Sequence, residues 1–169
     1  TAVRYGLFGS LPDINELENP KSKLASELYS EDGLMLGKYF LQNRSVVDFD
    51  EIGDNLTDAL VATEDERFYD HVGIDWKSIA RAVLSGGSDG GGSTITQQLA
   101  KNLFHVEDRR PVSKTGRIFQ KFKEWIIAVQ LEKRYTKDEI IALYLNTVQF
   151  SGHSFGIKAA AKEFFNKKP

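Results

Sequence analysis

The sequence predicts a mainly α domain preceded by a short β-hairpin segment. From about residue 54 onward, apolar residues recur at helical spacing, and capping residues or glycines separate the periodic stretches. Before that point, LASELYSEDGLMLGKYFLQNRSVVDF contains two extended patterns around Asp32-Gly33, a dipeptide typical of hairpin turns. The length of 169 residues fits one domain. We therefore divide the chain into a linker and hairpin segment, 1–50, and a helical domain, 51–169.

The first three expected helices each carry an apolar stripe. DNLTDALVATEDERFYDH begins behind a cap at Asp54 or Asn55, DWKSIARAVLSGG ends at glycine as helices often do, and a third helix starts near Thr94. The expected buried stripes, in order, are Leu56, Leu60 and Val61; then Trp76, Ile79, Ala80 and Val83; then Ile95, Leu99 and Leu103.

Three further helices complete the predicted domain. The stretch TKDEIIALYLNTVQF opens with a capping box formed by Thr136 and Glu139, and FGIKAAAKEFF is a short helix of small residues suited to close packing. Ahead of both lies RIFQKFKEWIIAVQLEKR, the longest periodic stretch. Its expected buried stripe is Ile118, Phe119, Phe122, Ile126 and Val129.

Composition and charge narrow the classes of function. The absence of cysteine excludes a disulfide scaffold, a cysteine nucleophile and thiolate zinc sites. No apolar run approaches the ~20 residues of a membrane span. Residues 1–75 carry 16 acidic and 6 basic residues, whereas residues 76–169 carry 8 acidic and 16 basic residues. The basic part is consistent with a solvated face, or with a site for phosphate, nucleic acid or an acidic membrane surface.

A glycine-rich helix start, GGGSTITQQLAKN, is the first candidate site. Thr94 and Gln97 match the capping box. The first N–H groups of a helix are unpaired and partly positive, and glycines ahead of them let an anion approach closely. Gln97 and Lys101 add an amide and a cation on one face. A nucleotide P-loop is rejected, because Gly92 stands where that motif needs lysine. The alternative is a flexible loop before an ordinary capped helix.

Two carboxylates are candidates for proton transfer. Glu64 follows Leu60 by four residues, near the buried edge of its helix, and lies beside other acids at the helix C-terminus. Such a position favours proton binding and suits a general base or acid. Glu124 shares a face with Lys121 on another helix. The alternatives are an exposed acidic turn for Glu64 and an ordinary surface ion pair for Glu124.

Five short motifs occur in order along the helical part of the chain. They are EDERFYDHVGID, GGSTITQQLAKN, QKFKE, IIALYLNTVQF and GIKAAAKEFF. Together they resemble the peptidoglycan glycosyltransferases of family 51, which occur in class A penicillin-binding proteins and as monofunctional transglycosylases. The resemblance covers about residues 45–169, and residues 24–50 look like the extended segment before this domain in bifunctional members. The fold it implies is mainly α and lysozyme-like, with two lobes and a cleft between them.

The resemblance implies polymerisation of lipid II into β-1,4 glycan chains. The growing lipid-linked chain is the donor, and the 4-hydroxyl of the incoming lipid II attacks its anomeric carbon with inversion, releasing undecaprenyl diphosphate. By its place in the first motif, Glu64 resembles the general base of the family. By its place in the third motif, Glu124 resembles a second carboxylate that assists at the donor diphosphate, directly or through a divalent cation such as Mg²⁺ or Mn²⁺. No cofactor is required by the sequence and no protein metal site is expected.

The same motifs imply a set of substrate-binding residues. The family usually has a basic residue where Gln120 stands, which removes one expected phosphate contact. Positioned cations stabilise the charge that builds on a departing diphosphate, so Lys121 and Arg117 are expected beside it. The expected substrate-binding residues are Asp65, Phe68, His71, Ser93, Thr94, Gln97, Gln98, Lys101, Asn102, Arg117, Lys121 and Asn146.

The resemblance also implies a location and partners. We expect the domain at the extracytoplasmic face of the bacterial cytoplasmic membrane, with its membrane anchor and the end of the family domain outside this sequence. The expected partners are lipid II, the growing glycan, the membrane surface, a fused transpeptidase domain and other cell-wall enzymes, and no nucleic acid. Because the substrate's lipid stays in the bilayer, we expect a mobile apolar and basic segment from Phe104 to Ile118 to meet the membrane.

Three other functions compete with this interpretation. A lysozyme-like glycan hydrolase or lytic enzyme would share the fold and one acidic residue, but its substrate has no diphosphate and needs no basic stretch. A non-catalytic docking module for wall enzymes is the second, although the presence of Glu64 and Glu124 argues against a degenerate domain. A nucleic-acid binder is the weakest, since no recognised nucleic-acid motif accompanies the basic residues.

Overall fold

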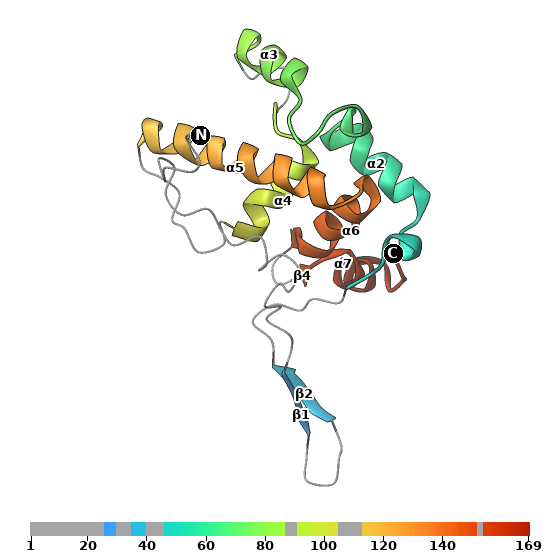
Figure 1. Cartoon of the computed structure of the whole chain (residues 1–169). Helices are drawn as coiled ribbons and strands as arrows, with labels where there is room; N and C mark the ends of the chain where they lie inside the picture. Colours follow the sequence, from blue (N-terminus) through green and yellow to red (C-terminus); the bar gives the residue numbers. More distant parts are fainter. Residues whose placement is uncertain (1–25, 30–34, 40–45, 87–90, 105–112, 152–153) are drawn as a thin grey trace.

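The computed structural model describes residues 26–29, 35–39, 46–86, 91–104, 113–151 and 154–169. Within these residues the protein is mainly helical, as the periodicity predicted, and consistent with a lysozyme-like class (Figure 1). The α-helices are α2 (Asp54–Glu64), α3 (Trp76–Leu84), α4 (Ile95–Phe104), α5 (Lys114–Arg134), α6 (Lys137–Thr147) and α7 (Ile157–Phe165). Two 3-10 turns are η2 (Phe49–Glu51) and η3 (Phe68–Asp70). A search of these helices for a membrane-spanning segment finds none.

Two small antiparallel strand pairs accompany the helices. Strands β1 (Ser26–Tyr29) and β2 (Met35–Tyr39) pair as the predicted hairpin, whose turn at Asp32-Gly33 lies outside the described residues. Strands β3 (Gln149–Ser151) and β4 (Ser154–Phe155) form a second pair that we did not predict. We expected helix up to residue 150, but Val148 is extended and ends α6, and its carbonyl accepts from Gly156 N.

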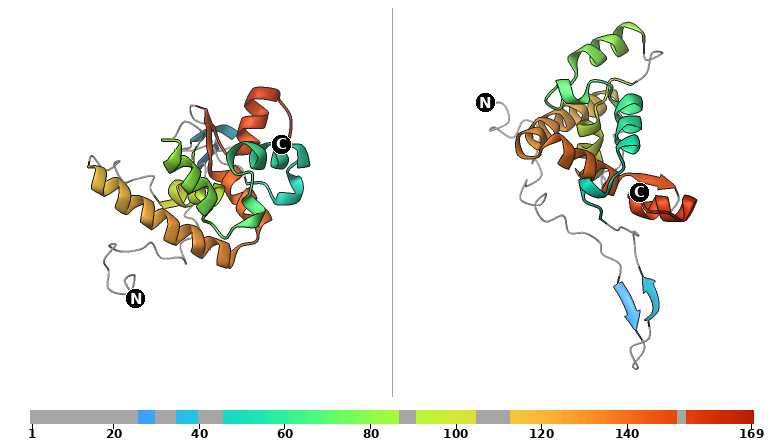
Figure 2. Two further views of the ribbon diagram at one scale, coloured as in Figure 1. Left: turned by 90° about the horizontal axis from the view of Figure 1, so that it is seen from above. Right: turned by 90° about the vertical axis from the view of Figure 1, so that its right-hand side faces the viewer.

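The core is built around α4, which packs against both α5 and α6. Ile95 and Leu99 are fully buried on the predicted side of α4. Leu131 from α5 and Ile140 and Ile141 from α6 are fully buried in the same cluster. The predicted apolar stripe of α2 packs against this cluster, and its side chains are partly buried. Figure 2 shows α4 enclosed by its neighbours, so its first turn has a fixed position in the fold.

At α3 and α6, side chains satisfy the first N–H groups of the helix. The capping box at α6 is confirmed: Thr136 accepts from Glu139 N, and the Glu139 carboxylate accepts from Thr136 N. At α3 the Asp75 carboxylate accepts from Lys77 N and Ser78 N. The expected cap of α2 at Asp54 or Asn55 is wrong by one or two positions, because Gly53 is the N-cap.

Two helices turn their apolar residues outward, contrary to our prediction. Helix α3 stands apart from the other helices (Figures 1 and 2), and its Trp76 and Val83 are 63% and 75% exposed. On α5, Phe119 is 52% exposed, and the buried face instead carries Glu124 and Ala128. The reason is packing: this face of α5 lies against α4, and Ala128 leaves room for the backbone of Gly73.

Gly73 holds the segment after η3 against α5. Its φ of +87° lies in the left-handed region, and an added Cβ would meet the backbone carbon and oxygen of Ala128 at 2.9 Å. The Gly73 carbonyl accepts from Thr94 Oγ1 at 2.9 Å and from Gln97 Nε2 at 3.1 Å. One glycine therefore joins this segment to α5 and to the start of α4.

We expect Gly73→Ala to lower the free energy of unfolding by about 2–4 kcal/mol, since a side chain at positive φ is strained and the Ala128 backbone cannot move aside. Urea denaturation followed by circular dichroism measures this. Gly91→Ala is the matched control, because within the part of the chain that the structure describes no atom lies within 4 Å of its added Cβ. Equal stability of the two variants would contradict this account of Gly73.

Candidate active site

Glu64 is the last residue of α2, and its exposed side chain borders an open pocket of about 320 Å³. Its Oε2 accepts a hydrogen bond from Gln98 Nε2 at 2.8 Å. The same pocket, here named the Glu64 pocket, is also lined by Arg67 and Arg81, and by Ser93 just before α4. A carboxylate so placed is open to a substrate hydroxyl, as a general base requires.

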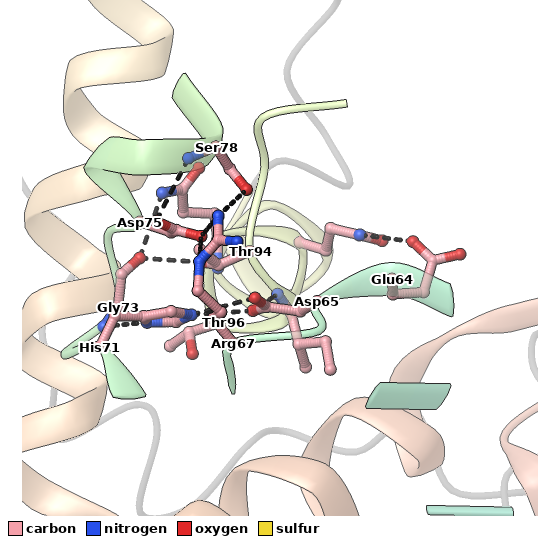
Figure 3. Close-up of polar contacts among 12 residues, drawn as sticks. Glu64, Asp65, Arg67, His71, Gly73, Asp75, Ser78, Thr94 and Thr96 are labelled. Carbon is pink, nitrogen blue, oxygen red and sulfur yellow. Dashed lines mark hydrogen bonds and ion pairs between the residues drawn. The ribbon is translucent and has the colours of Figure 1, made fainter. Parts of the chain in front are cut away.

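Asp65, the next residue, is buried and binds the start of α4 (Figure 3). Its Oδ2 accepts from Ile95 N at 3.0 Å, and both carboxylate oxygens lie within 3.1 Å of His71 Nε2. Because His71 Nδ1 accepts from Gly73 N, Nε2 is the nitrogen that donates to Asp65. Since a carboxylate is the natural partner of a helix N-terminus, Asp65 occupies the place where we expected the substrate's phosphate.

Thr94 and Gln97 also face inward at this helix start. Thr94 Oγ1 accepts from Gln97 N, which confirms half of the predicted capping box. The Gln97 side chain does not reach back to Thr94 but donates to the Gly73 carbonyl. Both residues are only 1% exposed. Among the described residues Gln97 Oε1 has no hydrogen-bond partner, although Gln97 lines a second pocket.

The second pocket, of about 550 Å³, is named the Glu124 pocket. Three basic side chains line it, Lys101 from α4 and Arg117 and Lys121 from α5, together with one carboxylate, Glu124. Ser93 and Gln98 line both this pocket and the Glu64 pocket, so the two adjoin. The excess of positive charge suits a diphosphate group.

Glu124 is 5% exposed and is held from its own helix. Lys121 Nζ donates to Glu124 Oε2 at 3.1 Å and to Ser93 Oγ at 2.7 Å. Gln120 Nε2 lies 3.4 Å from Glu124 Oε1. The pair is therefore not the ordinary surface pair that we considered, because the Glu124 side chain is only 7% exposed although that of Lys121 is 37% exposed.

Four expected substrate-binding residues line neither pocket. Phe68 is fully buried in the core under Lys137, whose Nζ lies 4.3 Å from the ring centre. His71 is bound to Asp65, as described above, and Asn102 lies further along α4. Asn146 bonds both backbone groups of Val47, at 2.9 and 2.8 Å. Phe68, His71 and Asn146 thus have structural contacts within the domain. Their contacts with substrate stay predictions.

A partly buried ion pair between Lys137 and Glu132 holds the segment that follows η3. Glu132 accepts from Lys137 Nζ at 2.9 Å and from Thr96 Oγ1 at 2.6 Å, and Lys137 also donates to the His71 carbonyl at 2.7 Å. These bonds tie the η3 segment to α4, α5 and α6, so the groups around Glu64 have little freedom to move.

Sequence reasoning missed the basic wall of the Glu64 pocket. Arg67 donates to Asp75 at 2.7 Å and to Ser78 at 2.9 Å (Figure 3), and Arg81 lies one turn further along α3. Burial disfavours the Asp75 charge, but bonds from Ser78 and Arg67 outweigh it and lower the pKa of Asp75. The sequence signal that could have pointed to this wall is Asp75, a typical N-cap residue directly before the amphipathic stretch of α3.

The donor set does not form a metal cage. Among the described residues no group of three or more His, Asp or Glu side chains is placed to hold a metal ion. Glu124 offers one carboxylate, and its oxygens already face Lys121 and Gln120. Because these partners compete for the same oxygens, Mg²⁺ or Mn²⁺, the alternative to direct assistance by Glu124, does not fit here as a protein-held ion, and we derive no step through one.

Comparison with known proteins agrees with the motifs. A family model described as Transglycosylase matches residues 32–169. Penicillin-binding protein 1A of Neisseria flavescens is 38% identical over 164 residues, covering 95% of this chain and 20% of that protein. Penicillin-binding protein 1F of Bacillus subtilis (strain 168) is 43% identical over 148 residues, covering 85% of this chain and 20% of that protein.

Penicillin-binding protein 1A of Escherichia coli (strain K12) is 37% identical over 171 residues, covering 96% of this chain and 19% of that protein. The chain thus spans about a fifth of the length of these relatives. The match of the family model extends over most of the sequence, including both pockets. The chain therefore belongs to the transglycosylase family.

Proposed function

We propose that this chain is a peptidoglycan glycosyltransferase that polymerises lipid II, with Glu64 as the general base. The observation that carries the proposal is the pair of adjoining pockets that share Ser93 and Gln98. One pocket offers an accessible carboxylate, and the other offers three cations around a buried carboxylate. A sugar whose anomeric carbon lies near Ser93 would have a proton acceptor on one side and an anion site on the other.

The proposed reaction transfers a glycan chain from diphosphate to a hydroxyl. The acceptor 4-hydroxyl, in the Glu64 pocket, gives its proton to Glu64 as its oxygen bonds to the anomeric carbon. The bond from that carbon to the phosphate oxygen breaks, and its electron pair leaves with the diphosphate. Lys101, Arg117 and Lys121 stabilise the negative charge that develops. Attack and departure on opposite sides of the carbon give inversion.

The remaining residues support these two pockets. Glu124 keeps Lys121 directed at Ser93, next to the shared wall. Asp65, His71, Thr94 and Gln97 fix the start of α4. A hydrolase would use Glu64 in the same way but would have no use for the cations of the Glu124 pocket, so product analysis separates the two functions.

A membrane surface is part of the proposal. The apolar surface consists of exposed residues on α3 and α5: Trp76, Val83, Leu84, Ile118, Phe119 and Phe122. Its two helices meet at Trp125, whose ring centre lies 5.5 Å from that of Trp76 and 5.2 Å from that of Phe122. It shares α5 with the cations of the Glu124 pocket. This arrangement suits a substrate whose sugars are bound while its lipid remains in a bilayer.

The apolar surface refines the expected membrane segment, Phe104 to Ile118. Residues 105–112 of that segment lie outside the described residues, whereas Ile118 is 57% exposed and begins the apolar surface on α5. The proposed location is the extracytoplasmic face of the cytoplasmic membrane. A fused transpeptidase domain and other wall enzymes stay proposed partners.

Replacing Glu64 separates the mechanism from the fold. Glu64→Gln keeps the shape but cannot take a proton, so lipid II polymerisation by the full-length protein should fall by about 10²–10⁴-fold. Binding of a diphosphate-linked donor mimic and the melting temperature should stay unchanged. Asp58→Asn, which removes an exposed carboxylate from the same helix, is the control. Polymerisation at near-normal rates in Glu64→Gln would remove Glu64 from the mechanism.

The cations of the Glu124 pocket should govern donor binding. We expect Lys101→Met or Lys121→Met to weaken binding of a diphosphate-linked donor mimic by about 10- to 100-fold, the range for one hydrogen bond to a charged group. Isothermal titration calorimetry measures this. Lys133→Met, on an exposed turn of α5 outside both pockets, is the control. If all three variants bind alike, the diphosphate lies elsewhere.

The apolar surface should determine membrane binding. The double variant Phe119→Ser/Phe122→Ser should bind anionic phospholipid vesicles about tenfold less tightly, because each half-exposed ring contributes on the order of 1 kcal/mol when it leaves water. Co-sedimentation with vesicles measures this. The control is Phe164→Ser/Phe165→Ser, which removes exposed rings from α7. Equal losses in both double variants would show that any exposed aromatic suffices.

A further inference from the structure

Three side chains form a hydrogen-bonded line from the core to Glu64. Tyr144 Oη, on α6, donates to Gln98 Oε1 at 3.1 Å. Gln98 Nε2, on α4, donates to Glu64 Oε2 at 2.8 Å. The line crosses three helices that are brought together only by tertiary packing, and it ends at the side chain to which we assigned proton transfer.

Burial along this line decreases toward the pocket. Tyr144 is 6% exposed and belongs to the core cluster, Gln98 is half-buried, and Glu64 is exposed. Tyr144 lines neither the Glu64 pocket nor the Glu124 pocket, whereas Gln98 lines both. A direct contact between Tyr144 and a bound substrate is therefore not expected, and its influence must pass through the Gln98 amide.

The chemistry of the three groups fixes the direction of both bonds. An ionised carboxylate can only accept, so the Gln98 amide must present its NH₂ group to Glu64. Its carbonyl oxygen then faces Tyr144, where only a phenol O–H can satisfy it. Burial, and then the negative charge of Glu64, raise the pKa of Tyr144, so the phenol keeps its proton.

We propose that Tyr144 is a positioning residue for Glu64: its hydroxyl locks the Gln98 amide so that an N–H points at the carboxylate. This inference rests on the proposed function, in which Glu64 is the base. Without the hydroxyl, the amide can turn its oxygen toward Glu64. The amide oxygen repels the ionised carboxylate but accepts a hydrogen bond from the O–H of the protonated carboxyl group. This orientation therefore disfavours the ionised form, which is the one that acts as base.

Other charged groups near Glu64 are held independently of this line. Asp65 is bound to His71 and Ile95 N, and Arg67 to Asp75 and Ser78. Glu66 and Arg81 also line the Glu64 pocket, and neither bonds Gln98 or Tyr144. A change at Tyr144 that alters the behaviour of Glu64 would therefore act through Gln98.

The test compares Tyr144→Phe with Tyr69→Phe in the full-length protein. Tyr144→Phe removes the hydroxyl and keeps the ring, while Tyr69→Phe makes the same chemical change at a half-exposed tyrosine outside both pockets. We expect kcat for lipid II polymerisation to fall about three- to tenfold in Tyr144→Phe, the range that one neutral hydrogen bond supports. KM should stay within about twofold, and the acidic limb of the kcat profile should move to higher pH. A kcat equal to that of the control, or a fall without any movement of the acidic limb, would overturn the proposal.

A second readout does not depend on turnover. The titration of the Glu64 carboxyl, followed by carbon-detected NMR, should have its midpoint at higher pH in Tyr144→Phe than in wild type and Tyr69→Phe. If this shift occurs but the wild-type protein does not polymerise lipid II, the proposed function fails and the positioning role stands. If polymerisation depends on Glu64 but Tyr144→Phe changes neither the midpoint of the Glu64 titration nor kcat, the positioning role fails and the proposed function stands.

Discussion

The carboxylate of Asp65 is the contact on which the candidate site depends. It closes the first turn of α4 by accepting from Ile95 N, and it fixes His71 and with it the path of the chain to Gly73. Because Glu64 is its neighbour, the same contact sets where α2 ends relative to α4. The helix start thus has an anionic partner within the protein, and its dipole stabilises the scaffold.

With the helix start occupied, the charge for binding the diphosphate of the proposed reaction has to come from side chains. In that proposal Lys101, Arg117 and Lys121 supply it, on the far side of Ser93 and Gln98 from Glu64. This separation has a chemical use. A proton acceptor and an anion site on opposite sides of one wall allow a hydroxyl to attack a carbon while an anion departs. The distance between them also keeps the cations from pairing directly with the Glu64 carboxylate.

Local patterns predicted much of the fold and part of the site. The α6 capping box, the stripe of α2 and the buried side of α4 were readable because each depends on neighbours in sequence. The contacts of Asp65 with Ile95 and of Asn146 with Val47 span 30 and 99 residues, and no local pattern contains them. The apolar stripe of α5 misled us, since periodicity does not distinguish a face that meets the core from one exposed on the surface.

The most direct test of this account is a crystal structure of the protein bound to a diphosphate-linked glycan donor mimic. The account predicts the diphosphate in the Glu124 pocket, within hydrogen-bonding distance of Lys101 or Lys121, with Asp65 still bound to Ile95 N and the anomeric carbon near Ser93. A diphosphate bound at the first turn of α4 with Asp65 displaced, or one bound in the Glu64 pocket, would contradict the division of the site into two pockets.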